Sequence, residues 1–206
     1  MKEGTKSIFL IVLGIYFILL GIFAIIFSLY NNNPSQILYA CYVGLILIGI
    51  GMLTKRSSII LSQVYLLTIP IMIWDIDFFH WIIFKGPLWG ITNYFFSTTP
   101  SILGNFISLQ HLYLVPLSIY ALTLIGVKRK DAWKWSLLEL VIIFIAVMTL
   151  SLPALNVDCV FHPCMNINFG IPYSIVWFLI SFIMVGVTAI ILNFFLWPRK
   201  NRRKKK

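Results

Sequence analysis

Long runs of apolar residues constrain this chain of 206 residues more than any other feature. A helix needs about 20 apolar residues to cross a hydrocarbon core of about 30 Å, and six stretches come near or exceed that length. With 60% hydrophobic and 11% charged residues, a soluble domain could not bury them all. The sequence therefore predicts an all-α, polytopic membrane helix bundle with six transmembrane helices, at Ile8–Tyr30, Ile37–Leu53, Ile59–Phe79, Pro100–Gly126, Trp135–Leu152 and Tyr173–Trp197.

The positions of lysine and arginine predict the orientation of these helices, because cytoplasmic loops are enriched in both residues. With six spans, the basic residues at the N-terminus, after spans two and four, and in the tail share one side, and Lys85 alone falls on the other. We therefore expect a plasma-membrane protein with both termini in the cytoplasm. It would consist of one six-helix domain, residues 1–198, and a basic cytoplasmic tail, residues 199–206.

The formal net charge of +10 follows from the same distribution. Basic segments beside a membrane hold the topology and attract anionic lipids at the cytoplasmic face. No nucleic-acid partner is needed to explain the charge, and the expected partner is the lipid bilayer.

The most unusual polar stretch ends the third span, where Asp75, Asp77 and His80 fall within six residues. A carboxylate in the middle of a bilayer costs roughly 2.5–3.5 kcal/mol, so such acids usually have a partner inside the protein. Helical spacing places Asp77 and His80 on one face. Asp75 lies about 200° from Asp77, so the two acids share a site only where the helix unwinds.

The aromatic segment 81–99 follows and allows two interpretations. It forms an interfacial or re-entrant cap over the outer face, or it is a plain aromatic belt at the membrane surface. Thr99 and Pro100 then predict the start of the next helix, with Thr99 as its N-cap. That start places His111 within the membrane and Ser108 one turn before it.

All three histidines fall in the expected outer half, which suggests a metal site. His80, His111 and His162, with Asp77 or Asp158, would suit zinc, which in catalytic sites takes three protein ligands and one water. The zinc-bound water would hydrolyse an ester or amide of a membrane-derived substrate. Three further side chains are expected to line the same pocket, namely Asp75, Asn166 and Asn168.

A metal-free hydrolase is the second hypothesis. His111 would act as the base and Ser108, Thr92, Thr98 or Thr99 as the nucleophile, oriented by an acid. Asp77 and His80 are the remaining catalytic candidates. No Gly-x-Ser-x-Gly motif is present, so this hypothesis depends on the residues lying close together.

Cysteine spacing and a non-catalytic role complete the alternatives. Cys159 and Cys164 lie in an outer loop, where an oxidising compartment permits a structural disulfide. The absence of a Cys-x-x-Cys motif argues against a redox enzyme.

In the non-catalytic hypothesis, the acids and histidines of the expected pocket bind an ion, a lipid or a partner protein.

Four groups of residues also resemble a known pattern. Trp74-Asp75-x-Asp77-Phe78, Gly90-x-Thr92-x-Tyr94-x-Phe96, Ser108-x-x-His111 and Asn166-x-Asn168-x-Gly170 are similar to a family of uncharacterised prokaryotic multi-pass membrane proteins. The resemblance covers roughly residues 74–170 and implies a bundle of about six helices, with no activity to carry over. Six helices with a histidine also resemble the androgen-induced-type membrane hydrolases, whose threonine has no match here.

Overall fold

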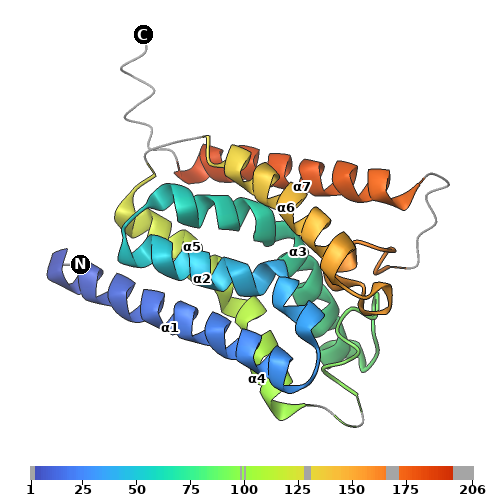
Figure 1. Cartoon of the computed structure of the whole chain (residues 1–206). Helices are drawn as coiled ribbons and strands as arrows, with labels where there is room; N and C mark the ends of the chain where they lie inside the picture. Colours follow the sequence, from blue (N-terminus) through green and yellow to red (C-terminus); the bar gives the residue numbers. More distant parts are fainter. Residues whose placement is uncertain (1–2, 98, 100, 128–130, 166–171, 197–206) are drawn as a thin grey trace.

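The fold is a bundle of helices lying side by side (Figure 1). The computed structural model describes residues 3–97, 99, 101–127, 131–165 and 172–196, and within these ranges it contains no strand. The α-helices are α1 (Glu3–Tyr30), α2 (Ala40–Leu53), α3 (Ser57–Phe84), α4 (Ile102–Ser108), α5 (Gln110–Ile125), α6 (Trp133–Leu150) and α7 (Tyr173–Leu196). Short 3-10 helices are η1 (Pro34–Leu38), η2 (Pro153–Leu155) and η3 (Val157–Cys159).

Five of the helical segments are long and apolar enough to cross a membrane: α1, α3, α4 with α5, α6 and α7. Helix α2 is apolar but has 14 residues, which makes it about 21 Å long and shorter than a hydrocarbon core. The described residues therefore confirm the predicted all-helical architecture with several helices that are long and apolar enough to cross a membrane. The second expected span is the short one.

Two of the differences from the expected helix boundaries bear on the candidate site. Helix α3 continues through Pro70 and ends at Phe84 rather than at Phe79. The next residue, Lys85, adopts a left-handed conformation with a φ of 57°. The fourth span begins at Ile102, so Thr99 is not its N-cap. Ser101 caps it instead, because its hydroxyl accepts the backbone N–H of Gly104 at 3.1 Å.

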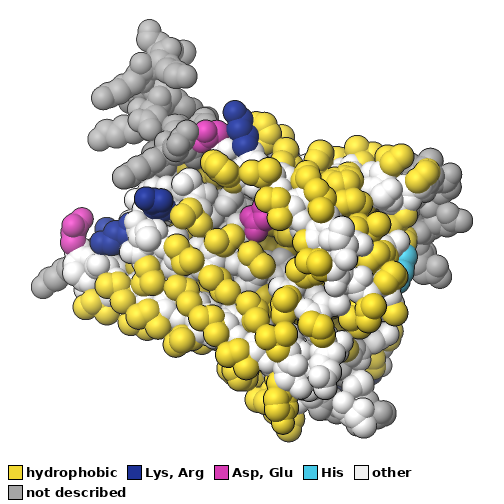
Figure 2. Space-filling model, viewed as in Figure 1, with side chains coloured by type: hydrophobic (Ala, Val, Ile, Leu, Met, Phe, Trp, Pro, Cys, Tyr) yellow, Lys and Arg dark blue, Asp and Glu magenta, His cyan; other side chains and the backbone are white. Residues whose placement is uncertain are grey.

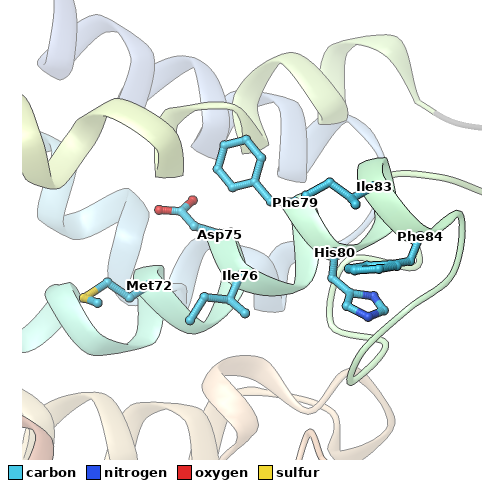
Figure 3. Close-up of a pocket in the computed structure, with 7 residues that line it drawn as sticks. All are labelled: Met72, Asp75, Ile76, Phe79, His80, Ile83 and Phe84. Carbon is cyan, nitrogen blue, oxygen red and sulfur yellow. The ribbon is translucent and has the colours of Figure 1, made fainter.

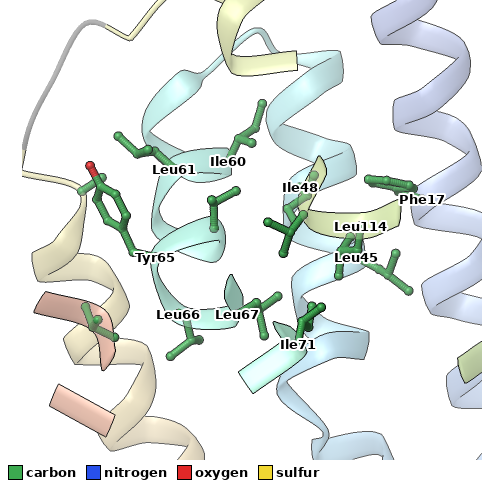
Figure 4. Packing of buried hydrophobic residues seen from close by; sticks show 14 of the residues in the cluster. Phe17, Leu45, Ile48, Ile60, Leu61, Tyr65, Leu66, Leu67, Ile71 and Leu114 are labelled. Atoms are coloured by element: carbon green, nitrogen blue, oxygen red, sulfur yellow. The ribbon is translucent and has the colours of Figure 1, made fainter. Parts of the chain in front are cut away.

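Helix α3 is the centre of the bundle, since it contacts α2, α5, α6 and α7. Its inner face and those of its neighbours form the apolar core shown in Figure 4. Phe17, Leu45, Ile60, Tyr65 and Leu114, from α1, α2, α3 and α5, have no exposed surface there. The polar stretch therefore lies on the helix that the rest of the bundle holds in place.

A close crossing joins α1 to α2. A Cβ atom added to Gly49 would lie 2.6 Å from the carbonyl oxygen of Gly14, so only glycine permits this approach. Small residues at such crossings allow membrane helices to pack by van der Waals contact.

The two ends of the bundle differ in charge. The start of α1 and the end of α7 lie at the same end (Figure 1). Apolar side chains cover most of the face shown in Figure 2, and its Lys and Arg side chains gather toward the end where α1 begins. A histidine lies at the opposite end of that face. This opposite end of the bundle carries the candidate site.

Candidate functional site

Asp77 is completely buried at the outer end of α3 and organises the loop that follows. Its Oδ1 accepts the backbone N–H groups of Leu88, Trp89 and Gly90 at 3.0, 2.7 and 3.3 Å. Its Oδ2 accepts the N–H and the hydroxyl of Thr92 at 2.8 and 2.7 Å. Five donors replace the water that a buried carboxylate loses, and bonds to a charged acceptor are stronger than neutral ones.

The chain can wrap around Asp77 because two residues take positive φ angles. Lys85 turns the chain back at the end of α3, and Gly90 has a φ of 85°, which glycine adopts without steric cost. The turn directs successive N–H groups inward, where they form a concave binding site for an anion. Here the anion is the side chain of Asp77 itself.

Aromatic side chains cover the same loop and pack it onto α3. Trp74 stacks on Phe78 with ring centroids 5.0 Å apart, and Phe95 meets Phe78 edge to face at 5.0 Å. Trp81 stacks on Phe96 at 4.9 Å. Residues 85–97 therefore pack against the outer half of α3, which favours the cap over the plain aromatic belt.

Ser108 and His111 belong to a chain of hydrogen bonds that joins this cap to α4 and α5. Trp74 Nε1 donates to the hydroxyl of Tyr94, which donates to Ser108 Oγ, each at 3.0 Å. Ser108 Oγ in turn donates to the carbonyl of Gly104 at 2.9 Å. His111 Nδ1 is bonded to the carbonyl of Ser108 at 2.8 Å, and its ring lies 4.6 Å from that of Trp74.

A second loop closes the outer end, and it contains the disulfide between Cys159 and Cys164. Asn156 organises this loop, since its Oδ1 accepts the N–H groups of Phe161 and His162 at 3.0 and 3.1 Å. Its Nδ2 lies 3.0 Å from His162 Nδ1. Two expected pocket residues, Asn166 and Asn168, lie outside the described residues.

Asp158 attaches the disulfide loop to the bundle. Its Oδ2 accepts the N–H of Ala40, the first residue of α2, at 3.0 Å, and its backbone carbonyl accepts Trp177 Nε1 from α7 at 3.0 Å. Burial raises the pKa of Asp158 from 3.8 to about 7, against the opposing effect of the Ala40 N–H. The carboxyl group is thus a cap for α2 that comes from a distant part of the chain.

The predicted zinc site is wrong. No group of three or more His, Cys, Asp or Glu side chains in the described part of the chain, which includes all the expected ligands, could hold a metal ion. The physical reason is that each expected ligand is engaged separately. Asp77 and Asp158 bind different backbone segments, and the histidines bond to three different groups, the carbonyls of Gly86 and Ser108 and the side chain of Asn156.

Asp75 has a different environment, because α3 does not unwind between the two acids. Its Oδ1 is buried without a hydrogen-bond partner. Asp75 borders an open groove of about 440 Å³ along the outer half of α3 (Figure 3). The groove is lined by apolar residues and two polar ones, namely Met72, Ile76, Phe79, Ile83, Phe84, Asp75 and His80.

His80 borders the other edge of the groove. Five residues of helix turn it about 140° from Asp75, and the two side chains point in different directions in Figure 3. Its Nδ1 is bonded to the carbonyl of Gly86 at 2.9 Å, and its ring lies 4.6 Å from that of Phe84. The structure therefore does not unite the histidines and acids in one cavity.

Sequence reasoning did not identify the buried polar residues deeper in the bundle. Gln63 in α3 is 1% exposed and donates to Glu139 Oε2 in α6 at 2.5 Å. Gln110 has no exposed surface, and neither of its amide atoms has a hydrogen-bond partner. Glutamine within an apolar span was the available signal, because such a residue normally faces the bundle interior.

No protein-family model matches the chain, and neither a curated protein nor a solved structure is significantly similar to it. The resemblance to prokaryotic multi-pass proteins stays an expectation.

Replacement of Asp77 by Asn should destabilise the protein by about 3 kcal/mol, because an amide group would face backbone donors and the charge that strengthens their bonds would be lost. Asp75→Asn is the matched control and should not destabilise the protein, since no described hydrogen bond is lost and an unpaired acid is removed. Thermal unfolding in detergent measures both. Equal losses in the two variants would contradict a special role for Asp77.

Stability should also depend on pH through Asp158. Because its pKa is about 7 when folded and 3.8 ordinarily, the folded state holds a proton that the unfolded state releases between these values. The free energy of unfolding should therefore be highest below pH 4, fall as the pH rises to 7, and then level off. Unfolding curves of wild type and Asp158→Asn across this range test the prediction. Identical pH slopes would refute it.

Proposed function

We propose that this chain is a six-pass plasma-membrane protein, with both termini in the cytoplasm, that binds a membrane-embedded partner without chemical turnover. The outer loops hold the helix ends in place, and α3 presents the binding surface sideways to the bilayer. The basic tail, residues 199–206, would contact anionic lipids at the cytoplasmic face.

Three observations support this orientation. Lys55 and Arg56 follow α2, on the same side as the start of α1 if α2 also crosses. The described ends of the chain lie together at one end of the bundle (Figure 1). The disulfide joining Cys159 to Cys164 is at the other end, which is expected on the oxidising side of a plasma membrane.

Hydrogen bonding favours binding over hydrolysis. A serine nucleophile needs its hydroxyl directed at a base, whereas the Ser108 hydroxyl donates to the carbonyl of Gly104. His111 Nδ1 is bonded to the backbone of Ser108, not to its hydroxyl. The Thr92 hydroxyl donates to Asp77, which already accepts four backbone N–H groups. Hydrolysis would require these bonds to be broken first.

The single observation that carries the proposal is the groove on α3 with Asp75 at its edge. Ligand sites are usually concave and largely apolar, with few polar groups that fix orientation. Asp75 borders this surface, and one of its carboxyl oxygens is buried without a hydrogen-bond partner. A ligand group that pairs with Asp75 would remove the cost of leaving it unpaired.

A photoreactive phenylalanine analogue at Phe79 should capture the bound partner in living cells. Phe79 is 50% exposed, lines the groove and lies five residues before the end of α3. Ile145 is the matched control, since it is 56% exposed and lies five residues before the end of α6. We expect a single adduct of defined mass from position 79 that Asp75→Asn reduces at least tenfold.

The same mixture of adducts from positions 79 and 145 would contradict the proposal. So would an adduct at position 79 that is unaffected by Asp75→Asn.

A further inference from the structure

The groove on α3 has the spacing of a helix-packing surface. Four lining residues recur at intervals of four, three and four residues along the helix, namely Met72, Ile76, Phe79 and Ile83, which are 53, 47, 50 and 67% exposed. Between residues 72 and 84 the surface extends about 18 Å. Side chains at this spacing form the ridges and holes into which side chains of another helix fit.

Asp75 lies too deep for its partner to be a lipid headgroup. Helix α3 has 28 residues, so it is about 42 Å long and extends about 6 Å beyond each side of a hydrocarbon core of about 30 Å. Asp75 is nine residues, about 14 Å, from the outer end at Phe84. It therefore lies about 8 Å inside the hydrocarbon, below the level at which headgroups reside.

The part of the sequence around α3 offers Asp75 a single cation. Lys85 is the only Lys or Arg between Arg56 and Lys128. It lies ten residues and about 15 Å from Asp75 along the same helix, farther than a lysine side chain reaches. A second copy in the same orientation would place its own Lys85 at the same height, so self-association does not supply the missing charge either.

Resting on the proposed binding role, we infer that the groove binds a transmembrane helix of another protein that carries a Lys or Arg at the depth of Asp75. Such side chains in membrane helices pair with acids because both charges are costly alone. The pairing of the basic residue with Asp75 would set the register of the two helices. The apolar residues of the groove would supply most of the contact area. In this arrangement the acid is Asp75, which has one oxygen without a hydrogen-bond partner, and the packing surface is the helically spaced groove that it borders.

Model peptides test the inference directly. The protein is reconstituted in phosphatidylcholine vesicles with a polyleucine helix carrying one Lys at the depth of Asp75, and association is measured by energy transfer from a label on the cytoplasmic tail. Two control peptides are matched to it. One carries Leu at that position, and the other carries its Lys in the opposite leaflet of the bilayer. We expect the first peptide to bind at least tenfold more tightly than either control, and Asp75→Asn to abolish the difference while Asp75→Glu keeps it.

Equal binding of the three peptides to wild type, or an unchanged preference in Asp75→Asn, would overturn the inference. Should the peptides bind equally while native mass spectrometry detects a lipid lost in Asp75→Asn, the helix partner is overturned but the binding role survives. If neither peptide preference nor such a lipid is found and the adduct at position 79 is absent, the binding role fails as well. Unfolding temperatures of the Asp75 variants in the same vesicles confirm that each is folded.

Discussion

A carboxylate inside a membrane protein must find donors, and the way Asp77 finds them determines the outer face of this molecule. Four backbone N–H groups and one hydroxyl surround it, all from the loop after its own helix. The loop must therefore fold back over α3. That fold brings Phe95 onto Phe78 and the Tyr94 hydroxyl between Trp74 and Ser108, so the positions of α4 and α5 follow from one buried charge.

The two acids of α3 differ in role because the helix between them stays intact. Asp77 accepts five hydrogen bonds from the loop, whereas Asp75 borders the groove and has one buried oxygen without a hydrogen-bond partner. An acid whose two oxygens both accept hydrogen bonds from the protein has a structural role. An acid inside the membrane without a hydrogen-bond partner is a candidate binding site for a ligand or another protein. Under the proposed function, Asp77 therefore serves stability and Asp75, two residues earlier, serves binding.

Sequence alone was sufficient for the architecture and insufficient for the site. Apolar runs and basic clusters predict a helical membrane bundle, because the thickness of the bilayer sets the length of a spanning helix and basic residues are enriched in cytoplasmic loops. The predicted zinc site is wrong in part because Asp77 and His80, which share a face of α3, bond to separate parts of the loop. Backbone donors carry no sequence signature, so neither the carboxylate cage nor the capping of α2 by Asp158 could be read from residue types.

Hydrogen exchange of the loop amides tests the central claim most directly. The N–H groups of Leu88, Trp89, Gly90 and Thr92 should exchange as slowly as amides inside α3, since opening any of them leaves a buried carboxylate without donors. Exchange of these four amides at the rate of an exposed loop would contradict the account, because Asp77 would then not hold the outer face together.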